Sequence, residues 1–462
     1  MLNWLQLLGG KNDDTGFVLT SGPDGSIYLG GETKLGAWDG HTNQGKADGF
    51  VARYDSNGRR SWTRWYATDQ DDQVRGLTVG VDGSIYVSGG TLNGMDGNAS
   101  FSSVGASDGF VSRIGPTGSK LWTQQVGGNS WDLARALGRA PDGSAIYVIG
   151  YSASPNFPSL SQLTPLPSGE GTPDAFVLRI NPDKTIQWAT RLGFGRDDWG
   201  MNIAVGADGF VYATGFSGSA NEASQAFLAK LNPQNGTTVW KKLIGTTQND
   251  YAESIRFSKD GFLYVLLSTD GNLDGKINQG NRDVAVQKYD LDGNRVWTVL
   301  HGSPAKEEGR NLTIDNDGNI YITGHTSGDL GGQKNNGGED AFITKITPTG
   351  QVEWTKLLGT AGNDVGWDVT TTVEGDLIVT GLTNGNLEGQ TSNGGQDIFL
   401  ASFKILPTPA LPTVTFTLNR ERIQENSYDS LIYTFTRSGP LDAPLLIQYS
   451  LTGSTDETDY IG

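Results

Sequence analysis

Seven acidic residues stand at one fixed distance from seven tryptophans, and they are the most regular groups in the chain that could do chemistry. The frame W-x9-[DE]-x9-[DE]-G recurs seven times without a gap. If the seven copies are arranged in a ring around a central channel, the seven carboxylates would lie together at one end of that channel and would attract Ca²⁺. The alternative is that each acid makes an Asx-type turn with the backbone, which we favour because a residue repeated in every copy serves every copy. The first acids of the seven frames are Asp14, Asp72, Asp132, Asp198, Asp250, Glu307 and Asp364.

A second candidate metal site is the stretch DGNLDG. It places Asp270, Asn272 and Asp274 at positions 1, 3 and 5 of a loop with Gly275 at position 6, the oxygen-ligand spacing that opens a calcium loop. Position 12 holds Asn281 instead of a bidentate Glu, and no helical pattern flanks the loop. A solvated Gly-Asn turn is therefore the alternative to a weak calcium site.

Four aromatic residues lie within three positions of these acids. They are Trp131, Trp199, Tyr251 and Trp367. At a channel mouth they would form a stacking platform for sugars. The alternative is packing between neighbouring units, which we favour because large aromatic side chains are usually buried.

Catalytic residues are harder to find. The chain has three histidines, His41, His301 and His325, which fall in different copies of the repeat, and none has a Ser or Asp partner at a spacing typical of a triad. There is no Cys to act as a nucleophile or to bind zinc as a thiolate. Nothing singles out two carboxylates for glycosidase chemistry. The sequence therefore predicts a protein that is not an enzyme, with a carbohydrate-active propeller of glycosidase or lyase type as the alternative.

The segments between these residues read as strands. Each copy contains two β-rich runs about an acid-Gly turn, such as GLTVGVDGSIYVSGG, then an Asp-x-Phe run such as DGFVSRI, and then the Trp run. We name these four strands A, B, C and D in chain order. Seven copies of a four-stranded unit of this length predict an all-β fold, a seven-bladed β-propeller. The tryptophans are Trp4, Trp62, Trp122, Trp188, Trp240, Trp297 and Trp354.

The two ends of this repeat are predicted to meet. The last copy ends at its C strand, QDIFLASFKI, with no Trp strand after it, whereas the chain opens on a Trp strand, MLNWLQLLGG, with nothing before it. We expect the N-terminal strand, near residues 2–8, to pair with residues 397–405 and to close the last blade. Insertions concentrate in the B–C loops, which share one face with the D–A loops, so we expect the binding face there.

Composition limits the partners. The chain of 462 residues has a net charge of −17, which disfavours nucleic acid and anionic membranes as partners. It has no apolar run long enough to span a membrane and no visible signal peptide.

Several motifs resemble a known family. DGFVSRIGPTGSKLWTQQVGG, VDGSIYVSGGT and GYSASPNFPSL are similar to the bacterial SBBP β-propeller repeat, over residues 1–405. Members of that family resemble extracellular or cell-surface modules of large proteins. The resemblance therefore implies an extracellular or cell-surface, adhesion-type module that binds a protein or glycan ligand, with a monomeric propeller inside a longer parent chain.

A second domain is predicted after residues 406–412, LPTPALP, which read as a Pro-rich linker. Residues 413–462 resemble the first half of a Calx-beta domain, so we expect a partial β-sandwich there. In that family Glu425 and Asp459 would match residues that supply calcium ligands, and the resemblance implies Ca²⁺ as a cofactor.

Overall fold

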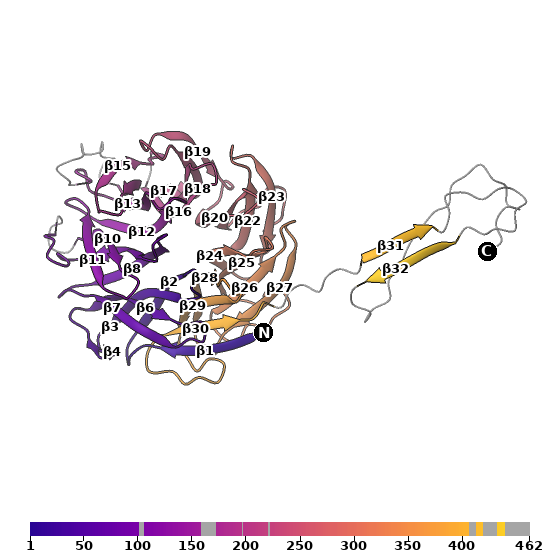
Figure 1. Ribbon diagram of the computed structural model, residues 1–462, viewed down its shortest axis with the longest axis horizontal. Coiled ribbons are helices and arrows are strands. Elements are labelled where there is room, and N and C mark those ends of the chain that lie inside the picture. Colours follow the sequence, from indigo (N-terminus) through magenta and orange to yellow (C-terminus); the bar gives the residue numbers. More distant parts are fainter. Residues whose placement is uncertain are drawn as a thin grey trace, which may run out of the picture. The chain divides into compact units, whose positions relative to one another are not determined.

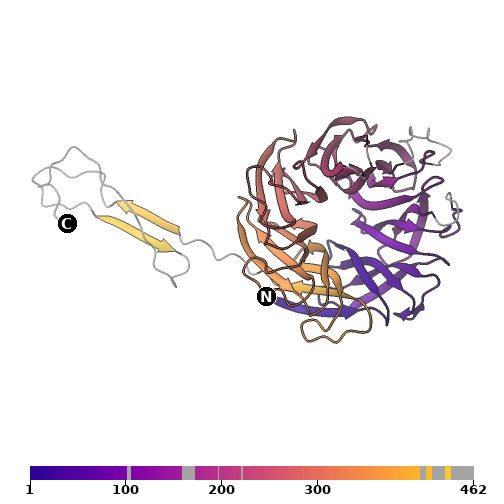
Figure 2. The same cartoon turned by 180° about the vertical axis from the view of Figure 1, so that it is seen from behind.

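Seven four-stranded antiparallel sheets surround a central channel in the computed structural model (Figure 1 and Figure 2). The structure describes residues 1–100, 106–158, 172–195, 197–219, 222–405, 413–418 and 432–438. Contacts divide the chain into two units, Met1–Lys404 and Ile405–Gly462. The described residues form strands and no helix, so they contain no helix that could span a membrane. The predicted all-β propeller with seven blades is confirmed.

Each blade presents its A strand to the channel and its B strand behind it. The A strands are β2 (Asp14–Ser21), β8 (Asp72–Val79), β12 (Asp132–Arg139), β16 (Asp197–Val205), β20 (Asp250–Phe257), β24 (Glu307–Ile314) and β28 (Asp364–Thr371). The B strands are β3 (Ile27–Lys34), β9 (Ile85–Thr91), β13 (Ile146–Ser152), β17 (Val211–Ser219), β21 (Leu263–Thr269), β25 (Ile320–Thr326) and β29 (Leu377–Thr383).

The C and D strands form the outer half of each blade. The C strands are β6 (Ala47–Tyr54), β10 (Asp108–Ile114), β14 (Asp174–Ile180), β18 (Glu222–Leu231), β22 (Asp283–Tyr289), β26 (Asp340–Ile346) and β30 (Asp397–Phe403). The D strands are β7 (Arg60–Tyr66), β11 (Lys120–Val126), β15 (Ile186–Arg191), β19 (Thr238–Ile244), β23 (Arg295–His301), β27 (Val352–Leu358) and, from the start of the chain, β1 (Leu2–Leu8). A short hairpin of β4 (Ala37–Trp38) and β5 (His41–Thr42) lies in the first B–C loop.

The core lies between blades. Tyr147 and Val177 of the third blade, for example, pack with Ile203 and Phe227 of the fourth. On the outer edges the repeated Trp of the D strand packs against the Tyr of the B strand in the same blade, as in the pair Tyr86 and Trp122. The Trp122 indole also donates a hydrogen bond of 3.0 Å to the Pro182 carbonyl of the next blade. The indoles of Trp4 and Trp188 make similar bonds to neighbouring blades. The packing against a B-strand Tyr occurs in six blades and is the more general reason why this residue recurs.

Every A strand carries one β-bulge, three residues after its acid. In six blades a B-strand glycine faces the bulge so closely that a Cβ atom there would come within 2.0 Å of the carbonyl oxygen beside it; at Gly89, this is the Gln73 oxygen at 1.9 Å. The ring of a C-strand Phe, such as Phe110, covers that glycine. In the fifth blade Leu267 takes the place of the glycine, and its cross-strand partner Ala285 takes the place of the Phe. The Leu–Ala pair has a total side-chain volume similar to that of the Gly–Phe pair.

The chain ends of the propeller meet in the seventh blade. Strand β1 pairs antiparallel with β30, with Leu5 opposite Ala401 and Leu8 opposite Ile398. Further hydrogen bonds join Met1 and Lys404 in both directions, at 2.9 and 3.0 Å. This is the closure that the sequence predicts.

The second unit is described only in part. Its described residues form one antiparallel pair, β31 (Thr413–Leu418) with β32 (Tyr433–Ser438). The predicted Pro-rich linker, residues 406–412, lies outside the described residues, and so do Glu425 and Asp459.

Removing the closing strand should destabilise the propeller. Deletion of residues 1–8 leaves β30 without its outer partner and exposes an edge, so we expect a clearly lower melting temperature. Leu5 is 8% exposed in this strand whereas Asn3 is exposed, so Leu5→Asp should also lower the melting temperature, by roughly 5 °C or more, while Asn3→Asp should leave it unchanged. An unaltered melting curve for the deletion would show that the ring does not depend on this strand.

Candidate functional site

The seven acids of the Trp frame lie at the start of the A strands, where all of them are at most 1% exposed. Each carboxylate accepts a hydrogen bond from the backbone N–H of the residue four positions earlier, over 2.6 to 2.8 Å. These are the contacts of a turn that fixes the D–A loop. The structure therefore places the predicted acidic ring in the blade interiors and not on the channel surface.

Burial changes the acidity of these groups. It raises the pKa of Asp72 to about 6, and the carboxylate of Asp48, on the C strand of the preceding blade, adds to the effect. The same pairing with a C-strand Asp of the preceding blade occurs for three others, whose pKa burial also raises to about 6. They are Asp14 with Asp397, Asp132 with Asp108, and Asp198 with Asp174.

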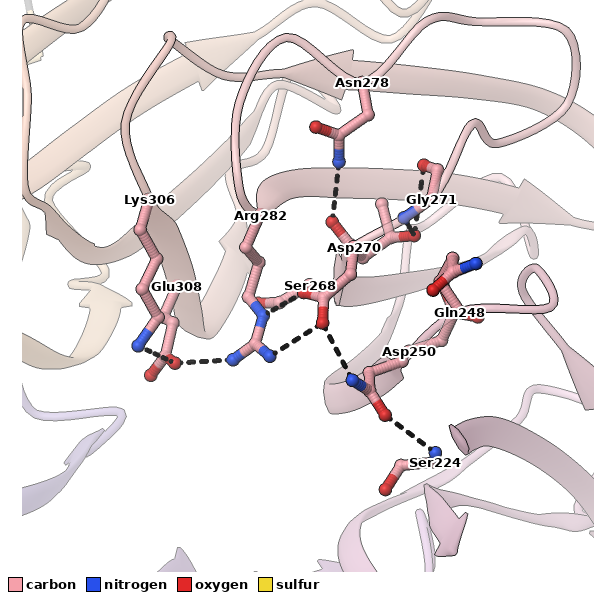
Figure 3. A network of polar contacts seen from close by, with 12 residues as sticks. Ser224, Gln248, Asp250, Ser268, Asp270, Gly271, Asn278, Arg282, Lys306 and Glu308 are labelled. Atoms are coloured by element: carbon pink, nitrogen blue, oxygen red, sulfur yellow. Dashed lines mark hydrogen bonds and ion pairs between the residues drawn. The ribbon is translucent and has the colours of Figure 1, made fainter. Parts of the chain in front are cut away.

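The three residues of the predicted calcium loop point in different directions. Asp270 accepts hydrogen bonds from Arg282 at the channel mouth (Figure 3). The Asn272 side chain accepts the Asn278 N–H at 2.9 Å, and Asp274 pairs with Arg295 at 2.5 Å. Among the described residues no group of three or more His, Asp or Glu side chains could hold a metal ion.

Three of the four predicted aromatics line the channel cavity. Trp199 and Tyr251 lie at its mouth, and Trp367 is one of the bulge residues. Trp131 is 58% exposed and is not among the cavity-lining residues.

The bulges determine what faces the channel, because a bulge redirects the side chain of its extra residue. All seven bulge residues line one cavity in the channel. They are Phe17, Arg75, Arg135, Met201, Glu253, Arg310 and Trp367. Trp367 apart, sequence reasoning missed this set, although a large or charged residue three positions after every acid was a signal that could have revealed it.

Three of the bulge residues are arginines, which we call the arginine cluster: Arg75, Arg135 and Arg310. Glu253 is the acid between them, 3.5 Å from Arg135 and 3.9 Å from Arg310. Among the described ion pairs Arg75 has no carboxylate partner; it donates to Gln73 and lies 3.5 Å from the centre of the Phe17 ring. Burial, together with the neighbouring charge of Arg135, lowers the pKa of Arg75 to about 10.

A network of charged groups lies beside this cluster (Figure 3), and two of its members, Arg282 and Glu308, line the same cavity as the three arginines. Arg282 bridges Asp270 at 2.6 Å and Glu308 at 2.7 Å. Glu308 also accepts from Lys306 at 2.7 Å and Arg310 at 2.9 Å. Burial tends to raise the pKa of Glu308, but these positive groups outweigh it and hold the pKa at about 2.

Aromatic rings form the wall beside this network, which we call the aromatic wall: Tyr151, Trp199, Phe216 and Tyr251. Ring centres lie 4.3 Å apart for Tyr151 and Trp199, 6.2 Å for Trp199 and Phe216, and 5.0 Å for Phe216 and Tyr251. Burial raises the pKa of Tyr151 while the charges of Arg135 and Arg75 oppose it, which places this phenol beside two members of the arginine cluster. The wall and the cluster line the same cavity.

The histidines lie apart from one another. His41 pairs with Asp48 at 2.6 Å, and His301 contacts Thr355 at 3.0 Å. Burial lowers the pKa of His301 to about 4 and that of His325 to about 3. Both are therefore neutral at physiological pH.

The buried acids should make the propeller more stable in mild acid. Their folded pKa of about 6 exceeds the ordinary value of 3.8, so protonation favours the folded state. This stabilisation is complete below about pH 4 and is lost as the pH rises through about 6. The melting temperature, measured by calorimetry at constant ionic strength, should therefore be higher at pH 5 than at pH 8.

Substitution tests whether these acids cause the effect. Asp72→Asn keeps an acceptor for the Thr68 N–H but does not titrate, so it should reduce the difference between pH 5 and pH 8. The control Asp292→Asn alters an exposed carboxylate and should leave the difference unchanged. A melting temperature that does not vary between these pH values contradicts the assignment.

Comparisons with known proteins agree with the repeat architecture. Residues 296–331 match the family described as Beta-propeller repeat, SBBP. The regulatory protein FlaEY of Caulobacter vibrioides is 27% identical over 265 residues, which cover 52% of this chain and 26% of that protein. The chain thus matches about a quarter of that relative's length.

Two solved structures have a similar fold. The Pan2 WD40 domain of Neurospora crassa is 11% identical, with a TM-score of 0.48 and coverage of 87% of this chain and 96% of that one. Hydrazine synthase of Kuenenia stuttgartiensis is 13% identical, with a TM-score of 0.46 and coverage of 80% of this chain and 92% of that one. Residues 296–331, which contain β24 and β25, are thus similar to the SBBP repeat and lie within a seven-bladed propeller.

Proposed function

We propose that this propeller is a non-enzymatic binding module that takes a small anionic ligand in its central channel. The observation that carries the proposal is the arginine cluster, in which bulges of three different blades direct Arg75, Arg135 and Arg310 into one cavity. Guanidinium groups bind carboxylates and phosphates through paired, charge-assisted hydrogen bonds.

The balance of charge in the cavity supports this ligand class. Glu253 pairs with Arg135 and Arg310, and Glu308 pairs with Arg310, whereas Arg75 has no carboxylate partner among the described ion pairs. The cluster therefore keeps a net positive charge inside a chain with a net charge of −17. Side chains of like charge repel one another at such a site, and burial makes the repulsion stronger. A bound anion would relieve it, and the walls of the channel would concentrate the positive potential that attracts one.

The proposal includes an extracellular or cell-surface location. It rests on the match to the SBBP repeat and on the resemblance of residues 413–462 to a Calx-beta domain. The ligand would then be free in the medium or part of a surface protein or glycan. Protease treatment of intact cells tests the location, because an intracellular protein would stay intact.

Calcium association, expected from DGNLDG and from the Calx-beta resemblance, stays a prediction. If Ca²⁺ binds the folded chain, millimolar CaCl₂ should raise the melting temperature relative to EGTA. Asp274→Asn should remove the part of the rise that arises from the DGNLDG loop, and Asp292→Asn, at an exposed carboxylate, should not. Identical melting curves in CaCl₂ and EGTA would refute it.

One observation favours the second candidate, a carbohydrate-active enzyme. Two carboxylates in the cavity differ in acidity: burial raises the pKa of Glu253, whereas neighbouring cations hold that of Glu308 at about 2. Such a divergence is typical of an acid and its partner carboxylate in glycosidases. Release of reducing ends from acidic oligosaccharides, abolished by Glu253→Gln, would establish this second candidate in place of the first.

Titration of simple anions tests the binding proposal. Isothermal titration of the full chain with sulfate, phosphate and acetate should give saturable binding that weakens as salt is added. Arg75→Gln removes a charge-assisted contact and should weaken binding about tenfold.

The control is Arg59→Gln, at an exposed turn far from the channel, and it should bind as the unaltered chain does. Binding that is absent, or that is equal in Arg75→Gln and the unaltered chain, refutes the channel as an anion site.

A further inference from the structure

The cavity that holds the arginine cluster is lined by two unlike kinds of group. The guanidiniums of Arg75 and Arg135 lie next to the aromatic wall, which β13, β16, β17 and β20 of the third to fifth blades contribute. The cavity that the arginine cluster and the aromatic wall share has a volume of about 340 Å³, whereas the cavity lined by all seven bulge residues has about 70 Å³. The larger volume lies at the lower end of the range of small-molecule sites and exceeds the need of a single inorganic ion.

The aromatic wall restricts what fits beside the anion. Its rings are half-buried and pack on one another, and the Arg282 guanidinium lies over the Tyr251 ring, 4.6 Å from its centre. The remaining ring faces and edges offer a ligand an apolar surface. Aromatic side chains offer such surfaces to the C–H faces of sugars and to other flat apolar groups. A ligand that uses both kinds of group must therefore combine an anionic group with an apolar face.

Two carboxylates in the cavity restrict the charge of that ligand. Glu253 and Glu308 line the same space, and each is held by arginine. Both carboxylates would repel a doubly charged anion, such as sulfate, more strongly than a singly charged one. Hydroxyl groups, in contrast, can donate hydrogen bonds to these carboxylates. The cavity thus favours a ligand with one negative charge and several hydroxyls.

Building on the proposed anion site, we infer that the channel binds a sugar acid, a pyranose ring with a single carboxylate as in the uronate residues of acidic glycans. The carboxylate pairs with Arg75 and Arg135, the apolar face of the ring lies on the aromatic wall at Trp199, and hydroxyls donate to Glu253 and Glu308. Entry is from the face of the D–A loops, because Trp199, Tyr251 and Glu308 each follow the first acid of their A strand and line the mouth.

The test compares a sugar acid with its neutral counterpart on the full chain. Isothermal titration with D-glucuronate should show saturable binding, and D-glucose should bind at least about tenfold more weakly because it lacks the group that pairs with the arginines. Sulfate is titrated alongside as a probe of the arginine cluster alone.

Two substitutions separate the contributions of the two kinds of group. Trp199→Ala should weaken the binding of D-glucuronate about tenfold, or about 1.4 kcal/mol, because it removes the ring on which the sugar lies. It should change sulfate binding less than twofold. Trp199→Phe retains an aromatic ring and should recover most of the loss. Arg75→Gln should weaken both ligands, and Arg59→Gln neither.

The outcomes distinguish the two proposals. Sulfate binding that depends on Arg75, with D-glucuronate no tighter than D-glucose or insensitive to Trp199→Ala, overturns the sugar acid and leaves the anion site standing. No binding of sulfate or D-glucuronate overturns both. A circular dichroism spectrum and melting curve for each variant confirm that it is folded.

Discussion

The bulge in each A strand is the feature on which the channel depends. A regular strand would alternate its side chains between the two faces of the blade, and its inner edge would present mainly backbone. The extra residue breaks this alternation and turns one side chain per blade into the channel. Space for the bulge comes from the B-strand glycine, since a Cβ atom at Gly89 would lie 1.9 Å from the Gln73 oxygen. The glycine of the B strand thus allows the bulge, and the bulge places one side chain of each blade in the channel.

Buried carboxylates hold the loops that lead into these strands. Each acid of the Trp frame satisfies a backbone N–H four residues earlier, and the C-strand acids Asp48, Asp283, Asp340 and Asp397 do the same in the B–C loops. A neutral side chain would avoid the cost of burying charge. The carboxylate gives a stronger hydrogen bond. The raised pKa of Asp72 records the part of the burial cost that its bonds do not offset.

Much of the fold could be predicted from the sequence because the same strand pattern and the same spacings recur in every copy of the repeat. The Trp and acid spacings gave the number of blades, and the unpaired Trp4 and C strand at opposite ends gave the closure. The acids were also the most regular candidates for a site, yet they serve the turns. The arginines were not predicted because the bulge position holds different residue types in different blades, and a search for repeats finds only residues that recur. The other four blades have Phe17, Met201, Glu253 and Trp367 at the position of Arg75, Arg135 and Arg310. Their meeting in space depends on ring geometry and on seven bulges, neither of which is local in the sequence.

This division follows from the symmetry of the propeller. A residue that supports every blade must recur in every blade, so repetition favours structural roles. A ligand without sevenfold symmetry needs different groups around it. Only positions whose side chains do not support the fold can provide such groups. The bulge position meets this condition, because its side chain lines the channel cavity and, in six blades, a glycine opposite leaves space for the bulge. It therefore accommodates Arg, Glu, Met, Phe or Trp at little cost to the fold, and this freedom is what the proposed binding role requires of the residues that face the channel.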